Sequence, residues 1–259
     1  MISASQPIRK QLDAGCTILD MENADLCIIG AGYAGINVLN AACPHLPDGA
    51  RVVVVDRGTR FGGQWTDQYD YVRLHQPHET FTAHDREWAI TKTKPKGHLA
   101  SKTEILSHFE DIAAACIAEH NIELVTLFNY EYDCHTVEDG KVVLTVNPTS
   151  AVEPSGMVAP VSIVATHLFR AEGFNVIIKT PFVLSAPSSP TGPGARVHSL
   201  CPADVLTAQW SALMRYSLPD TPIYVIGSGK TAMDIIYHLS KREKSAADRL
   251  HCIAGRGTW

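Results

Sequence analysis

The 259-residue sequence lacks several features that would assign it to other classes of protein. It contains no run of about 18 apolar residues, so we expect no spanning helix and no membrane partner. It carries no surplus of positive charge, because its formal net charge is −5, and nothing in that balance favours a nucleic-acid partner. Its N-terminal stretch lacks the apolar core of a signal peptide, which predicts a cytoplasmic protein.

The sequence also lacks any C-x-x-C pair, although it contains seven cysteines. An odd number of scattered cysteines argues against a disulfide framework, a zinc site and a redox pair of the thioredoxin-reductase type. His75, His78 and His84 lie in one loop-rich region, but no further residue there has the spacing of a metal ligand. We therefore predict no metal site.

Two glycine motifs are the most informative features that the sequence does contain. Gly30-Ala31-Gly32-Tyr33-Ala34-Gly35 follows the apolar run 26–29, and Gly227-Ser228-Gly229-Lys230-Thr231-Ala232 follows the apolar run 223–226. Each pattern predicts a buried strand, a tight turn and a helix whose N-terminus can hold a pyrophosphate. One such motif is weak evidence. Two in this context predict two nucleotide sites, and so flavin chemistry driven by a nicotinamide cofactor.

The residue that follows the second strand of each site indicates which nucleotide it prefers. Asp56 lies 21 residues after Gly35, where a carboxylate accepts hydrogen bonds from the adenosine ribose and repels a 2′-phosphate. Arg256 takes the corresponding place at the second site, and Lys230 adds positive charge there. A guanidinium pairs well with a 2′-phosphate, so we expect FAD or NAD rather than NADP at the first site, and NADP rather than NAD at the second. The alternatives are a turn aspartate and a surface arginine.

The second motif also has the alternative of a nucleoside triphosphatase site, because Gly229-Lys230-Thr231 matches the end of a P-loop. That loop requires a glycine where this chain has Tyr224. Tyr224 lies inside an apolar run that predicts a strand, so we do not expect a long phosphate-wrapping loop here.

The hydrophobic pattern predicts an α/β protein with two Rossmann-like dinucleotide-binding domains, the first carrying an added β-meander and the second truncated. We expect helices at 33–43, 101–120 and from the second motif to 242, with a capping box at Ser101 and Glu104. The expected strands are 25–30, 51–56, 122–130, 131–137, 141–146, 161–170, 174–180, 223–226 and 250–254. The expected divisions are an N-terminal tail (1–22), an FAD-binding domain (23–190), a linker (191–221) and the start of an NADP-binding domain (222–259).

Five blocks in the same order resemble flavin-containing monooxygenases, including the plant-type members and their Baeyer–Villiger relatives. The blocks are Gly30–Gly35, Phe61-Gly62-Gly63-Gln64-Trp65, Tyr69–His75, Ser101-Lys102-Thr103-Glu104 and Gly227–Asp234. The resemblance covers most of residues 24–259 and implies FAD and NADPH as cofactors. It also implies that Gly62, Gly63 and Trp65 lie against the flavin.

The chain departs from this family at three points. Pro187 stands where a glycine is expected at a strand end, and His75 stands where N-oxygenating members carry an asparagine. Relatives are about twice as long, and their C-terminal part supplies a segment that holds the flavin. We therefore expect loosely bound FAD, poor catalysis and, from exposed apolar strands, self-association.

The predicted function is an NADPH-using, FAD-dependent monooxygenase, or a fragment of one, that oxygenates a small organic substrate with O₂ through a peroxyflavin. The alternatives are a flavin-dependent reductase or dehydrogenase without oxygenation, and a non-catalytic FAD-binding protein. No catalytic residue is assigned. The residues expected to bind the cofactors are Gly30, Gly32, Tyr33, Ala34, Gly35, Asp56, Arg57, Gly62, Gly63, Gln64, Trp65, Gly227, Gly229, Lys230, Thr231, Ala232 and Arg256.

Overall fold

The chain divides into two compact units in the computed structural model. Unit 1 comprises Met1–Asp67 and Gln76–Val176, and unit 2 comprises Gln68–His75 and Ile177–Trp259. Unit 2 therefore takes a short segment, 68–75, from within the sequence of unit 1. The structure describes residues 8–9, 19–149, 159–173, 180–181, 197–205, 207–216, 220–242 and 244–255.

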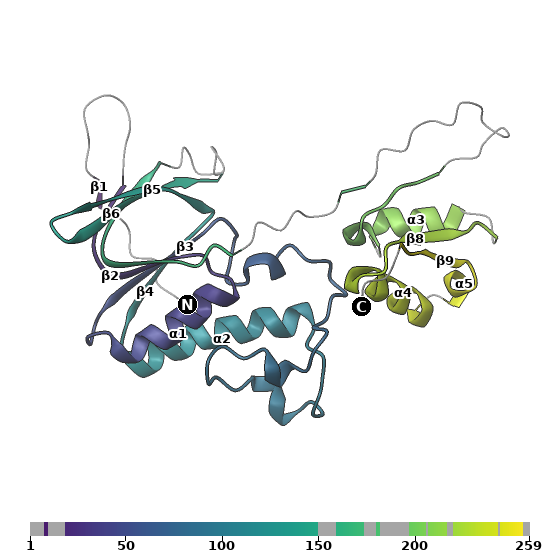
Figure 1. The fold of residues 1–259 in the computed structure, drawn as a ribbon, viewed down its shortest axis with the longest axis horizontal. Coiled ribbons are helices and arrows are strands. Elements are labelled where there is room, and N and C mark those ends of the chain that lie inside the picture. The colour runs from purple at the N-terminus through teal and green to yellow at the C-terminus, as the bar shows by residue number, and fades with distance from the viewer. Residues whose placement is uncertain are drawn as a thin grey trace. The chain divides into compact units, whose positions relative to one another are not determined.

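Unit 1 is built on a mixed β-sheet with the strand order β4-β3-β2-β7-β6-β5 (Figure 1). Strands β4, β3, β2 and β7 run parallel to one another, whereas β6 pairs antiparallel with β7, and β5 pairs antiparallel with β6. A short β1 (Ile8–Arg9) also pairs with β2. The bounds are β2 Leu19–Ile29, β3 Arg51–Asp56, β4 Glu123–Phe128, β5 Tyr130–Glu138, β6 Lys141–Pro148 and β7 Val161–Arg170.

Two helices, α1 (Tyr33–Ala42) and α2 (Lys102–His120), contact each other on one side of strands β2, β3 and β4, and the β5–β6 hairpin, which continues the same sheet, packs against the other side (Figure 1). The β-branched run Val52–Val55 of β3 is fully buried, as expected of a strand covered on both faces. Alternate residues of β2 and β3 pack against the hairpin, among them Cys27, Ile29, Val53 and Val55. The sequence prediction of a nucleotide-type α/β core with an added β-meander is thus supported at the level of the fold.

The predicted capping box at the start of α2 is present. Ser101 Oγ accepts from the backbone N–H of Glu104 at 3.4 Å, and the Ser101 N–H donates to Glu104 Oε2 at 2.8 Å. Such a reciprocal pair satisfies two N–H groups that a helix start leaves free. Asn121 ends the helix in a left-handed conformation, with φ 47°.

Unit 2 contains a two-stranded parallel sheet made of β8 (Ile223–Ile226) and β9 (Leu250–Ile253). Its helices are α3 (Ala208–Tyr216), α4 (Lys230–Arg242) and the short α5 (Lys244–Ala247). Sequence analysis did not predict α3, which falls within the expected linker. The core of this unit is Val205, Trp210 and Leu239, and Tyr71 of segment 68–75 packs against it. That contact explains why the segment belongs to unit 2.

One face of the β8–β9 sheet exposes apolar side chains: Tyr224, Ile226 and Ile253 are 58%, 64% and 52% exposed. These exposed residues are consistent with the expected self-association, which stays a prediction. The predicted strand 174–180, apart from residue 180, and Pro187 lie outside the described residues.

Candidate nucleotide-binding sites

The first glycine turn connects the end of β2 to the start of α1, and its glycines are required by close packing. Gly30 has φ +107°, and a Cβ built on it would lie 2.4 Å from the carbonyl oxygen of Ala171. A Cβ on Gly35 would lie 1.8 Å from the carbonyl oxygen of Gly30. Both distances are far below a van der Waals contact, so only glycine fits at either position.

The Gly62–Trp65 segment lies directly against this turn, although about thirty residues separate them in sequence. The Gly62 N–H donates to the carbonyl oxygen of Ala31 at 2.9 Å. Gly63 has φ +52°, and a Cβ on it would lie 2.7 Å from the Cα of Gly32. The two glycine-containing segments therefore touch backbone to backbone, as expected of two segments that bind parts of one ligand.

The N-terminus of α1 and the indole of Trp65 both offer hydrogen-bond donors in this region. Gly32 is the N-cap of α1 and supplies no side chain to cap it, so the first N–H groups of the helix are available to an anion. Trp65 Nε1 is buried without a hydrogen-bond partner in the structure. An unpartnered buried donor is uncommon and fits a site that receives an acceptor from a ligand.

Aromatic side chains border the same turn. The ring of Tyr33 stacks on Phe81 with 4.3 Å between centroids, and Trp65 meets Phe81 edge-on at 5.9 Å. The hydroxyl of Tyr33 donates to the carbonyl oxygen of Thr82 at 2.7 Å. Sequence analysis missed Phe81, because a single phenylalanine in a loop-rich region carries no positional signal.

Asp56 braces the first turn from the end of β3. Its Oδ2 accepts from the Ala31 N–H and its Oδ1 accepts from the Gly58 N–H, both at 2.6 Å. The turn-aspartate role that sequence analysis kept as an alternative is therefore present. Each carboxylate oxygen can accept a further hydrogen bond, so the predicted ribose contact stays a prediction. Arg57 and Gln64 are exposed, as are Tyr33 and Ala34.

The second glycine turn connects β8 to α4 and is much less crowded than the first. Gly227 has φ +124° and its N–H donates to the carbonyl oxygen of Ile253 at 2.9 Å. A Cβ on Gly229 would meet no atom within 4 Å. Thr231 is exposed beside it, and Ala232 is buried. Arg256 lies outside the described residues, so its predicted choice of NADP over NAD stays a prediction.

The side chain of Lys230 is engaged within unit 2 by acceptors that sequence analysis did not assign to the site. Its Nζ forms an ion pair with Asp234, one helical turn further along α4, and donates to the carbonyl oxygen of Arg73 at 2.5 Å. The hydroxyl of Tyr69 donates to the same Asp234 oxygen at 2.7 Å. Burial raises the pKa of Tyr69 and Asp234 raises it further, so the phenol stays a neutral donor near pH 7.

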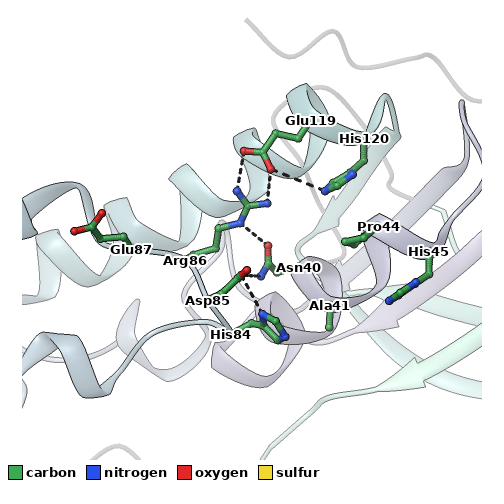
Figure 2. Close-up of a pocket in the computed structure, with 10 residues that line it drawn as sticks. All are labelled: Asn40, Ala41, Pro44, His45, His84, Asp85, Arg86, Glu87, Glu119 and His120. Carbon is green, nitrogen blue, oxygen red and sulfur yellow. Dashed lines mark hydrogen bonds and ion pairs between the residues drawn. The ribbon is translucent and has the colours of Figure 1, made fainter.

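A separate hollow of about 440 Å³ lies in unit 1 (Figure 2). Arg86 crosses it: its guanidinium donates to both carboxylate oxygens of Glu119, at 2.8 and 2.7 Å, and its Nε donates to Asn40 Oδ1 at 2.7 Å. The hydrogen bonds between the two groups raise the pKa of Arg86 and lower the pKa of Glu119. None of the predicted site residues lines the hollow. We interpret Arg86 as a structural link that connects loop 84–87 to α1 through Asn40 and to α2 through Glu119.

In the described part of the chain, no helix is long and apolar enough to cross a membrane. The same residues contain no group of three or more histidine, cysteine or acidic side chains that could hold a metal ion.

No family model matches the chain. Three curated relatives, uncharacterized proteins of Mycobacterium tuberculosis (two strains) and Mycobacterium bovis, are 27% identical over 244 residues. The alignment covers 91% of this chain but 39% of each relative, so the chain spans less than half of their length.

Solved structures show the fold more directly. A polycyclic ketone monooxygenase from Thermothelomyces thermophila matches with a TM-score of 0.56 and 21% identity, over 93% of this chain and 36% of the enzyme. OTEMO in complex with FAD and NADP matches with a TM-score of 0.51 and 20% identity, over 91% and 39%. A bacillithiol disulfide reductase from Staphylococcus aureus matches with a TM-score of 0.52 and 13% identity, over 92% and 59%.

These likenesses confirm the resemblance to flavin monooxygenases as a likeness of fold. The chain has an α/β structure with a mixed sheet and a small second sheet, similar to part of these enzymes, of which OTEMO was solved in complex with FAD and NADP.

Proposed function

We propose that the chain is the nucleotide-binding part of an FAD- and NADPH-dependent monooxygenase that acts on a small organic substrate with O₂. The observation that carries the proposal is the backbone contact between Gly32 and Gly63, beside the uncapped N-terminus of α1 and the unpartnered Trp65 Nε1. These features form a cradle for a ligand that carries both a phosphate and a flat ring with acceptor atoms. FAD is such a ligand.

The residues of unit 1 have separable tasks in this proposal. The N–H groups at the start of α1 bind the pyrophosphate, Asp56 holds the turn and receives the ribose hydroxyls, and Trp65 Nε1 donates to the bound flavin nucleotide. FAD, when bound, supplies the hydride and oxygen chemistry. In unit 2, the turn at Gly227–Gly229 binds the pyrophosphate of NADPH, and Arg256 selects its 2′-phosphate.

The test uses a substitution that fills the cradle without disturbing the fold. A Cβ on Gly32 would lie 3.4 Å from the Cα of Gly63, an ordinary contact, so the Gly32→Ala variant should fold. The added methyl occupies the space that a phosphate needs, and we expect FAD binding to weaken about ten- to a hundredfold, the effect of losing one charge-assisted hydrogen bond.

FAD affinity is measured from the quenching of flavin fluorescence, and the melting temperature is recorded alongside. The matched control is Gly255→Ala, where a Cβ would meet nothing within 4 Å. Equal FAD affinity in Gly32→Ala and the parent chain would show that the cradle does not bind FAD.

A flavin-dependent reductase without oxygenation is the second candidate, supported by the fold match to the bacillithiol disulfide reductase. The two candidates differ in what O₂ becomes. A monooxygenase places one oxygen atom of O₂ in the organic product, whereas a reductase oxidises NADPH without transferring ¹⁸O from ¹⁸O₂ to any organic product. A chain that binds FAD but oxidises no NADPH would be the third candidate, a non-catalytic FAD-binding protein.

A further inference from the structure

One carboxylate oxygen in unit 2 holds two donors from different parts of the chain. Asp234 Oδ2 accepts from the Tyr69 hydroxyl at 2.7 Å and pairs with the ammonium of Lys230. The Tyr69 side chain comes from segment 68–75, whereas Lys230 and Asp234 belong to α4. Tyr69 is only 8% exposed, so this contact is shielded from solvent.

Lys230 connects the same segment to the glycine turn. It is the first residue of α4 and follows Gly229 directly, so its ammonium lies where a phosphate at the turn would attract it. Of its three N–H groups, one donates to the Arg73 carbonyl oxygen at 2.5 Å and another to Asp234. A phosphate at the turn would have to compete with both acceptors for this cation.

We propose that Asp234 is a positioning residue that couples phosphate binding at the second glycine turn to segment 68–75, by competing with the phosphate for Lys230. This inference rests on the proposed nicotinamide site at Gly227–Gly229. A bound phosphate draws Lys230 away from the Arg73 carbonyl, and the segment then stays attached through Tyr69–Asp234 and through Tyr71, whose hydroxyl donates to Pro202.

The proposed coupling predicts that loss of the Asp234 charge strengthens NADP⁺ binding, which a purely structural role of Asp234 would not do. Removing the charge of Asp234 frees Lys230 for the phosphate, so the Asp234→Asn variant should bind NADP⁺ more tightly than the parent chain. Loss of a structural contact would instead weaken binding. The pair is partly exposed, with side-chain exposures of 33% for Lys230 and 19% for Asp234, so we expect about a two- to fivefold gain.

A double-substitution cycle separates this competition from simple repulsion between Asp234 and the phosphate. The four chains are the parent, Asp234→Asn, Lys230→Met and the double variant, each titrated with NADP⁺ and with inorganic pyrophosphate by calorimetry. Competition predicts that Asp234→Asn tightens binding only when Lys230 is present. An equal gain in the Lys230→Met background would mean direct repulsion and would overturn the proposal.

Tyr71→Phe is the matched control, because it removes a hydrogen bond made by a tyrosine hydroxyl of the same segment and leaves the hydrogen bonds of Asp234 in place. Its NADP⁺ affinity should equal that of the parent. Hydrogen exchange of residues 69–75 supplies the second measurement: NADP⁺ should speed exchange in the parent and leave it unchanged in Lys230→Met. Unchanged exchange in the parent would contradict the proposed link to the segment.

These titrations need neither bound flavin nor turnover. A chain that retains no FAD and oxidises no NADPH would therefore defeat the proposed function, while the cycle would still decide the coupling. A parent chain that binds neither NADP⁺ nor pyrophosphate would overturn the coupling itself.

Discussion

The two glycine turns share a sequence pattern but differ in how tightly the structure encloses them. In the first turn, side chains on Gly30 or Gly35 would overlap backbone atoms at 2.4 and 1.8 Å. In the second, a Cβ on Gly229 would meet nothing within 4 Å. The first turn is braced by Gly62, Gly63 and the Asp56 carboxylate, whereas the cation beside the second is held by Asp234 and a backbone carbonyl.

The comparison teaches that a glycine motif can be required for two different reasons. In unit 1, Gly30 and Gly35 are needed for the backbone to pack, and the ligand cradle results from that packing. Of the two glycines in the second motif, only Gly227, with φ +124°, is required by its own conformation. The following predictions test this contrast between the two turns.

The largest effect is expected from Gly35→Ala. Its Cβ would overlap the Gly30 carbonyl, and neither backbone can move without disrupting β2 or α1. We expect a loss of about 4 kcal/mol or more in the free energy of unfolding, measured by urea denaturation. Gly229→Ala should stay within about 0.5 kcal/mol of the parent. Similar losses at both positions would end the contrast between the turns.

Asp56→Ala should have the next largest effect. The substitution leaves the Ala31 and Gly58 N–H groups without the carboxylate that each meets at 2.6 Å. Two charge-assisted bonds of this kind contribute about 3 kcal/mol together, and the loss should appear in urea denaturation of unit 1. Asp56→Asn, which keeps one acceptor, should lose less; if it lost as much as Asp56→Ala, the bracing role would be wrong.

Acid should destabilise unit 1 through His108, a buried side chain that stacks on Trp88 at 4.0 Å. Burial lowers the pKa of His108 from 6.5 to about 4, with a further contribution from His78. The unfolded chain therefore binds the proton more readily, and stability is lost as pH falls from about 6.5 to 4. The loss should reach about 2–3 kcal/mol.

His108→Phe keeps the stacking on Trp88 and removes the titration, so its stability should not change over that pH range. Glu104 affects the stability of unit 1 at a lower pH than His108 does. Although burial alone would raise its pKa, hydrogen bonds from Ser101 and His98 lower it to about 2, so its contribution is lost only between about pH 4.5 and 2. Thermal melts at pH 7, 5.5 and 4.5 follow the titration of His108, and melts below pH 4.5 follow that of Glu104.

The smallest effect is expected from Tyr71→Phe in unit 2. The variant loses one hydrogen bond, from the hydroxyl to the Pro202 carbonyl at 2.9 Å, and keeps the ring in the core of the unit. We expect a loss of about 1 kcal/mol by urea denaturation, read from the transition of unit 2. No change at all would mean that segment 68–75 is held by its apolar contacts alone.

Local signals in the sequence predicted much of unit 1. Residues 161–170 form β7 as predicted, and the Ser101–Glu104 capping box marks the start of α2, because both signals involve residues close in sequence. Strand β2 is longer than expected and begins at Leu19, since its extension depends on pairing with β7, which no local pattern reports. Helix α3 was missed because it lies in a segment flanked by Pro202 and Pro219, which the sequence pattern assigned to a linker.

The sites could be predicted only in part for the same reason. The glycines and Asp56 have fixed spacings, so the sequence identifies them. The ion pair of Lys230 with Asp234 was available as an i, i+4 spacing, but its partner Tyr69 lies 165 residues away in sequence. Only the folded chain brings such residues together.

Because segment 68–75 belongs to unit 2, the two units cannot be separated by one cut, and unit 2 cannot fold early during synthesis. The chain passes from one unit to the other after Asp67, after His75 and after Val176. No single cut yields both units intact, and a fragment that begins at residue 177 would lack Tyr71, which packs against the core of unit 2. During synthesis, residues 68–75 leave the ribosome long before α4, so this core cannot close until most of the chain has emerged.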